Sequence, residues 1–126
     1  MTAKQETTGG AEIDAEIDAR IAELKKKLGK KLAIAAHHYQ DPAIVAFADF
    51  VGDSYRLAVE AAKTEARYIV MCGVGFMAES VAVLARPDQT VLMPVPQAGC
   101  PMADMISPEQ ARAVCESAGA VPVVYM

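Results

Sequence analysis

Cysteine is scarce in this sequence. Its 126 residues include three cysteines, Cys72, Cys100 and Cys115, and no two of them have the Cys-x-x-Cys spacing of metal and redox motifs. An odd number of widely spaced cysteines argues against a fold that depends on disulfides and fits a reducing compartment. We therefore expect a cytoplasmic protein.

Long apolar runs and basic stripes are also missing. No apolar stretch reaches the about 20 residues that span a bilayer, and no apolar segment of a secretory signal follows Lys4. The net charge is −4, and the lysines from Lys25 to Lys31 end a predicted helix, where cations favour the helix dipole. We expect neither a nucleic acid nor a membrane as a partner.

What the chain does have is a high apolar content arranged in alternating helical and strand patterns. Apolar residues make up 53% of the chain, enough for the core of one domain and for an apolar surface that a partner or further sequence covers. The patterns predict helices over 13–28, 41–47, 53–62, 75–85 and 108–117, and strands over 32–36, 50–51, 68–72, 90–93 and 121–126.

Strands that alternate with helices indicate a parallel sheet covered on both faces. We therefore predict an α/β fold, a three-layer αβα arrangement with a short parallel sheet. Residues 1–10 are expected to form a disordered tail, residues 11–120 one α/β domain, and residues 121–126 the start of a second domain. Because the last apolar strand needs a neighbour, we expect the chain to be the front part of a longer protein.

Polar residues follow the predicted strands at a single edge of the sheet. His37, His38 and Tyr39 come after the first strand, Ser54 after the short second strand, and Cys100 after the fourth. Ligands of open α/β sheets bind beyond the carboxyl ends of the strands. This edge is therefore the candidate site, and we expect an imidazole, a hydroxyl and a sulfur to face a common hollow there.

Each of these residues also has a purely structural interpretation. Adjacent residues at a strand end point to opposite sides, so His37 and His38 are expected to diverge, and either ring suits acid–base chemistry or a bond to a loop carbonyl. Tyr39 is a packing residue or a phenol donor to a substrate oxygen. Ser54 either binds a carboxylate or phosphate at a helix start or helps to cap that helix, for which Asp53 is the expected cap.

Cys100 stands between Gly99 and Pro101, at the expected start of a helical turn. A helix N-terminus lowers the pKa of a thiol and favours the thiolate, which binds metals or attacks electrophiles. The alternative is a small residue in a tight turn. Cys72, in a predicted strand, and Cys115, on a predicted helix, are expected to be inert core thiols.

The segment Gly73-x-Gly75-x-x-Ala78 follows a predicted strand and opens a helix, as a dinucleotide-binding motif does. That motif also needs an acidic residue about 20 positions further on, and residues 93–95 supply none. We therefore expect the glycines to permit a tight turn.

Together, four segments resemble quinolinate synthase in order and spacing. They are Ala36–Gln40, Asp49–Ser54, Gly73–Glu79 and Ala98–Met105. The resemblance covers about residues 12 to 126. It implies that the chain is the first of three similar α/β domains around one central active site, with the entrance to the second.

The resemblance also implies an activity and a cofactor. Quinolinate synthase condenses iminosuccinate with dihydroxyacetone phosphate, losing phosphate and water, and its product feeds NAD synthesis. A [4Fe-4S] cluster is held by three cysteines, one from each domain, and the remaining iron is open as a Lewis acid. By this likeness Cys100 is the cluster ligand, His37 and Ser54 bind the dicarboxylate, His37 supplies proton transfer, and Tyr39 lines the pocket near the triose.

The chain departs from the family pattern because the other two cluster cysteines and the other domains' substrate ligands are absent. We therefore expect the chain alone to be inactive and unable to hold a stable cluster. Two other functions remain open from the residues. One is a small flavodoxin-like module that binds an anionic metabolite without catalysis, and the other is a structural subunit completed by another chain.

Overall fold

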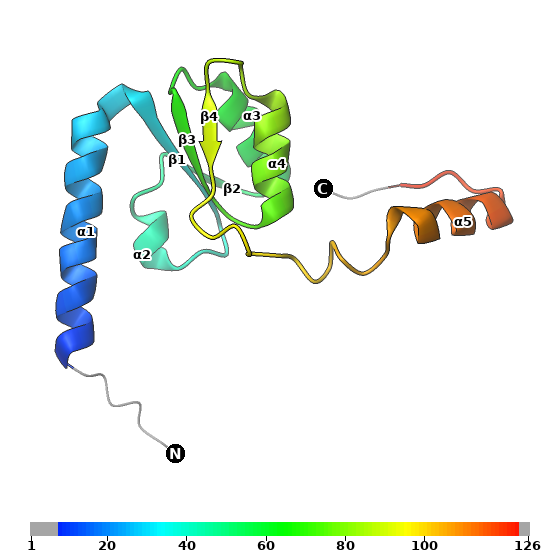
Figure 1. The fold of residues 1–126 in the computed structure, drawn as a ribbon, viewed down its shortest axis with the longest axis horizontal. Coiled ribbons are helices and arrows are strands. Elements are labelled where there is room, and N and C mark those ends of the chain that lie inside the picture. Colours follow the sequence, from blue (N-terminus) through cyan, green and yellow to red (C-terminus); the bar gives the residue numbers. More distant parts are fainter. Residues whose placement is uncertain (1–7, 124–126) are drawn as a thin grey trace.

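A four-stranded parallel sheet forms the centre of the protein. The computed structural model describes residues 8–123, and side chains from residue 14 onward. The strands lie in the order β2-β1-β3-β4, with helices on both faces of the sheet (Figure 1), which confirms the predicted three-layer α/β fold. The elements are α1 (Thr8–Leu28), a 3₁₀ turn (Gly29–Lys31), β1 (Leu32–His37), α2 (Pro42–Val45), β2 (Phe50–Gly52), α3 (Ser54–Lys63), β3 (Tyr68–Cys72), α4 (Gly75–Leu84), β4 (Thr90–Leu92) and α5 (Pro108–Ala118).

One face of the sheet packs tightly against α3 and α4. Side chains that alternate along the strands point to this face, as the two-residue period of a strand requires. The core consists of Ala35, Leu57, Ala58, Ala61, Ile69, Met71, Met77 and Val81, all buried. The hydrophobic core of the protein therefore lies between the sheet and these two helices.

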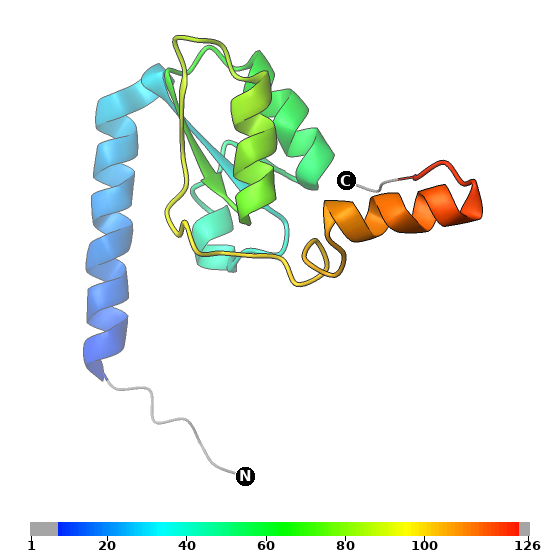
Figure 2. The same cartoon turned by 45° about the vertical axis from the view of Figure 1, so that its right-hand side comes forward.

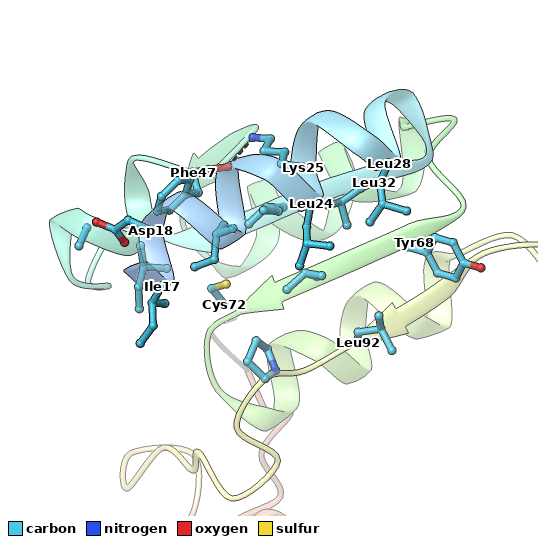
Figure 3. Close-up of a pocket in the computed structure, with 16 residues that line it drawn as sticks. Ile17, Asp18, Leu24, Lys25, Leu28, Leu32, Phe47, Tyr68, Cys72 and Leu92 are labelled. Carbon is cyan, nitrogen blue, oxygen red and sulfur yellow. Dashed lines mark hydrogen bonds between the residues drawn. The ribbon is translucent and has the colours of Figure 1, made fainter. Parts of the chain in front are cut away.

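The opposite face of the sheet lies under α1 and α2 and is less completely filled. A cavity of about 720 Å³ separates α1 from the strands (Figure 3), and its lining is almost wholly apolar. Ile17, Ile21, Leu24 and Leu28 line it from α1, and Ile34, Val70, Cys72 and Leu92 from the sheet. The apolar stripe of α1 therefore faces the sheet, as its helical period predicted.

Asp49 links α1 to the edge of β1. One carboxylate oxygen accepts a hydrogen bond from the Ile34 amide at 2.8 Å, and the other lies 2.9 Å from the Lys25 ammonium group of α1. Lys25 also donates to the carbonyl of Phe47. These polar contacts place α1 beside the sheet although the cavity separates their apolar surfaces.

The helix starts follow the capping residues that the sequence indicated. Asp41 accepts from the Ala43 amide ahead of Pro42, and Asp53 accepts from the Arg56 amide at the start of α3. Ser107 and Gln110 form a reciprocal capping box at the start of α5. Gly119 ends that helix with a positive φ of 60°, a conformation that glycine adopts without strain.

Several boundaries differ from those predicted. Residues 8–10 belong to α1 rather than to a tail, so Gly9 and Gly10 continue the helix despite the low helix propensity of glycine. The helix α2 ends at Val45, two residues early, and β4 ends at Leu92. Residues 121–123 are not in a strand, since none of the described residues pairs with them.

The remaining parts of two expected segments, residues 1–7 and 124–126, lie outside the described residues. The division of the chain into domains therefore stays a prediction. No helix in the part of the chain that the structure describes is both long and apolar enough to cross a membrane.

The helix α5 extends away from the sheet, on the far side of the molecule from α1 (Figures 1 and 2). The loop that leads to it exposes two methionines, Met102 and Met105, each with 78% of its surface accessible. Val114 on α5 and Val121 beyond it are also exposed. Part of the high apolar content of the sequence therefore lies on the surface around α5, and the rest forms the core.

Candidate functional site

The carboxyl ends of the parallel strands bring two of the candidate segments together. His37 at the end of β1 is the register partner of Gly52 at the end of β2. Asp53 and Ser54 follow Gly52 directly, so the imidazole and the start of α3 share one edge of the sheet. This adjacency is the one that the strand-end rule predicted.

His37, His38 and Tyr39 form a compact group of aromatic rings. The His37 and His38 ring centres are 4.4 Å apart with planes inclined by 26°, and the Tyr39 ring lies 4.5 Å and 4.2 Å from them. The prediction that His37 and His38 point to opposite sides is therefore wrong. The strand ends at His37 and a turn follows, with the Gln40 amide donating to the His37 carbonyl, so strand alternation no longer applies.

The His37 ring is half-buried and bonded to the backbone of the turn. Its Nδ1 accepts a hydrogen bond from the Tyr39 amide at 3.2 Å. Burial lowers the pKa of His37 below its usual 6.5, and the positive charge of His38 acts in the same direction, whereas the Asp53 carboxylate opposes both. His37 is therefore a neutral imidazole near pH 7.

The structure of the start of α3 bears on the two interpretations of Ser54, which were helix capping and anion binding. The Asp53 side chain caps the helix, so the capping role does not fall to Ser54. Ser54 is the half-buried first residue of a ten-residue helix, at the positive end of the helix dipole. Its hydroxyl is therefore placed where an anionic group would be stabilised.

Tyr39 is the most exposed member of the aromatic group, with 83% of its surface accessible. It is not buried in the core, which weighs against the interpretation of Tyr39 as an ordinary packing residue. Its phenol is free to reach a ligand above the edge of the sheet.

Cys100 lies on the loop that follows β4, and this loop is tied to the start of α4. The Gly75 amide donates to the Ala98 carbonyl at 2.8 Å. The Cys100 carbonyl then accepts from the amides of Ala103 and Asp104 at 2.9 Å and 3.2 Å, which is the pattern of one helical turn. The prediction that Cys100 begins such a turn is therefore confirmed, although the turn does not continue as a helix.

The other two cysteines have separate environments. Cys72 lines the apolar cavity under α1, and burial raises the pKa of its thiol. Cys115 is half-buried on α5, a helix without a fully buried residue, so the prediction that it is a core thiol is wrong. Across residues 14–123, no three His, Cys, Asp or Glu side chains are grouped so that they could hold a metal ion.

The expected common hollow is formed by neither of two cavities in the part of the chain that the structure describes. The larger cavity lies on the face of the sheet under α1, and a smaller one of about 350 Å³ lies at the amino ends of β1, β2 and β3. His37, Tyr39, Ser54 and Cys100 line neither of them.

Of the two glycines after β3, Gly73 has a packing role, and neither adopts a backbone conformation reserved for glycine. Neither Gly73 nor Gly75 has a positive φ, so the expected tight turn does not depend on glycine backbone freedom. A Cβ atom on Gly73 would lie 2.9 Å from the sulfur of Met77 and 3.0 Å from the methyl group of Met71. The Gly75 amide already binds Ala98, so it is not available for the phosphate of a dinucleotide.

One feature of this edge, and another at the amino end of β2, were not foreseen from the sequence. The His38 ring binds the carbonyl of Gly52 at 3.2 Å, and Asp49 joins α1 to β1. The repeated histidine was visible, but the bend that stacks the rings depends on the turn after β1. Asp49 could have been found as the acidic residue between two apolar segments, although its two partners are distant in sequence.

Comparisons with known proteins give one family. The family described as quinolinate synthetase A protein matches residues 19–126. A quinolinate synthase of Herpetosiphon aurantiacus is 57% identical over 99 residues, which are 79% of this chain and 26% of that protein. A quinolinate synthase of Dehalococcoides mccartyi strain ATCC BAA-2266 is 53% identical over 108 residues, 86% of this chain and 35% of that protein.

A third relative, the quinolinate synthase of Streptomyces coelicolor, is 47% identical over 121 residues, which are 90% of this chain. The match covers 31% of that relative. The chain therefore spans about a quarter to a third of the length of the curated relatives it matches.

Proposed function

The chain belongs to the quinolinate synthetase A family, and on this premise we propose that it is the amino-terminal part of a quinolinate synthase. The proposed reaction of the complete enzyme is the condensation of iminosuccinate with dihydroxyacetone phosphate to quinolinate, with loss of phosphate and water. The observation that carries the proposed site is the pairing of His37 with Gly52, because it sets the imidazole beside the start of α3.

In this proposal His37 and Ser54 bind a carboxylate group of the dicarboxylate substrate. The imidazole and the hydroxyl supply hydrogen bonds, and the N-terminus of α3 adds the positive end of its dipole. Tyr39, whose ring extends from the same turn, lines the pocket on the side of the triose. The arrangement favours an anionic substrate over a neutral one.

Cys100 in this proposal supplies one ligand to a [4Fe-4S] cluster. The described residues do not fit such a cluster by themselves, because they offer no group of three suitable side chains and a cluster ordinarily takes about four ligands. The further ligands then come from the two additional domains of an enzyme of the relatives' length. When bound, the cluster would supply a Lewis acid that polarises a carbonyl or hydroxyl oxygen.

The exposed apolar residues around α5 support the proposal of additional domains. Met102 and Met105 precede α5 and Val114 lies on it, and all three are exposed. The helix α5 itself extends away from the sheet (Figure 2). Large apolar side chains exposed on an extended segment are available to pack against further protein. We place the remaining domains against this surface, which also adjoins the loop of Cys100.

A chimeric enzyme tests the proposal. The segment of the Herpetosiphon aurantiacus quinolinate synthase that matches this chain is replaced by the corresponding residues of this chain, and quinolinate formation is measured anaerobically after cluster reconstitution. We expect an active chimera. His37→Ala and Ser54→Ala should each lower kcat/KM by about 10- to 100-fold, since a hydrogen bond to a charged group contributes about 1.5–3 kcal/mol.

Matched controls make the result specific. Val83→Ala removes an exposed side chain of α4 and should leave the activity unchanged. Cys100→Ser should abolish activity and iron binding, whereas Cys115→Ser should preserve both. An active chimera that tolerates both His37→Ala and Cys100→Ser would reject the proposed site.

A further inference from the structure

The His38 ring has a defined protonation pattern. Its Nδ1 lies 3.2 Å from the Gly52 carbonyl oxygen, and the His38 amide lies 3.2 Å from the same oxygen. A carbonyl oxygen only accepts hydrogen bonds, so Nδ1 of His38 must carry the proton. Neutral His38 is therefore the Nδ1–H tautomer, with a lone pair on Nε2.

The His37 ring has the opposite pattern. Its Nδ1 faces the Tyr39 amide at 3.2 Å, and an amide N–H only donates. Nδ1 of His37 therefore has no proton, and neutral His37 carries its proton on Nε2. The two stacked rings thus form a pair in which His37 offers a donor and His38 an acceptor at Nε2.

The hydrogen bond of His38 also fixes the position of the turn. It adds a side-chain anchor to the backbone bond between residue 38 and the last residue of β2. The next residue along is Tyr39, whose amide binds His37. A turn held at residue 38 therefore keeps the Tyr39 amide on Nδ1 of His37.

We propose that His38 is a positioning residue, which acts through its bond to Gly52 and holds His37 as the Nε2–H tautomer. His37 then meets an anionic oxygen as a hydrogen-bond donor, and in its neutral form it has no free lone pair to act as a base. The identity of that oxygen as a substrate carboxylate rests on the proposed function. The assignment of opposite tautomers to His37 and His38, and the positioning role of His38, do not depend on the proposed function.

Nitrogen NMR spectroscopy of the imidazole rings tests the two assigned tautomers directly. The chain has only two histidines, so two-bond ¹H–¹⁵N correlation spectra of the ¹⁵N-labelled chain at pH 8 contain two imidazoles. We expect one ring of each tautomer. His37→Asn should remove the Nε2–H pattern and leave the Nδ1–H pattern of His38. Two rings of the same tautomer, or the reverse assignment, would overturn the proposal.

Two variants separate the anchor from the ring. His38→Asn keeps a donor near the position of Nδ1, and His37 should remain the Nε2–H tautomer. His38→Phe keeps an aromatic ring without a donor, and His37 should then populate both tautomers. A single Nε2–H tautomer in His38→Phe would show that His38 does not position His37. Backbone amide spectra check that both variants are folded, which is expected at this exposed position.

The chimeric enzyme distinguishes this inference from the proposed function. His38→Phe should lower its kcat/KM by about tenfold, the effect of roughly one hydrogen bond, and His38→Asn should restore most of it. The expected tautomers together with an inactive chimera would contradict only the proposed function. Equal activity of the two His38 variants would contradict the positioning role.

Discussion

At the scale of single residues, the environment of His37 decides what the site can do. Its ring is half-buried and stacked on His38, and the negative charge of Asp53 acts to raise its pKa. A neutral imidazole and a serine hydroxyl at a helix start are both hydrogen-bond donors. These two donors are the reason why we propose that this edge of the sheet binds an anionic group.

Titration of His37 tests this environment. The pKa of His37 should lie below 6.5 because of burial and the charge of His38. Asp53→Asn, which keeps a good helix cap, should lower that pKa further, and His38→Asn should raise it. The measurement is the pH dependence of the imidazole signals in NMR spectra. A pKa above 6.5, or shifts of the same sign in both variants, would contradict the assigned causes.

The same lowered pKa affects stability. The folded state binds the His37 proton less tightly than the unfolded state does, so unfolding takes up a proton between the lowered pKa and about 6.5. The contribution of His37 to stability is therefore complete above about pH 6.5 and is lost as the pH falls through the lowered pKa. His37→Asn should reduce this part of the pH dependence of urea unfolding.

At the scale of the elements, the sheet and the helices α3 and α4 carry the fold. The strands of this part were predicted within about a residue, because four or five consecutive apolar residues between glycine, proline and charged residues have few other structures. The capping residues Asp41, Asp53 and Ser107 predicted the helix starts for the same local reason. The incomplete packing of α1 against the sheet could not be predicted from local sequence, because it depends on contacts between distant segments.

Leu57 of α3 tests the assignment of the core. Only 1% of its surface is accessible, so Leu57→Ala should lower the free energy of unfolding by about 2–5 kcal/mol. The matched control Val83→Ala, on the exposed face of α4, should change it by less than about 0.5 kcal/mol. Urea unfolding followed by circular dichroism gives both values. Equal effects of the two substitutions would show that α3 is not packed as described.

At the scale of the whole molecule, the sequence predicted that His37 and Ser54 follow neighbouring strands, but it did not predict how the site residues are arranged around a cavity. His37 and Ser54 share an edge because β1 and β2 pair, and pairing follows from the alternation of elements. Cys100 follows β4 on a loop held by the hydrogen bond between Gly75 and Ala98, and the sequence did not indicate that bond. The hollow expected to join all three is formed by neither of the two cavities described above, and local patterns along the sequence carry no information on such long-range assembly.

The incomplete ligand set leads to a prediction about iron. Anaerobic reconstitution of the chain by itself should yield no stable four-iron cluster, because the described residues contain no group of three ligands. The chimeric enzyme, treated in the same way, should bind about four irons per chain. Iron analysis and the absorption spectrum after chelation measure both. A stoichiometric cluster in the chain alone that chelators remove slowly would refute this prediction.

The most direct test of the central claim is a crystal structure of the chimeric enzyme with a bound dicarboxylate such as succinate. We expect a carboxylate group within hydrogen-bonding distance of both His37 Nε2 and Ser54 Oγ, with the Cys100 sulfur facing the same cavity. A dicarboxylate bound away from both side chains, or the three groups on different sides of the molecule, would contradict it.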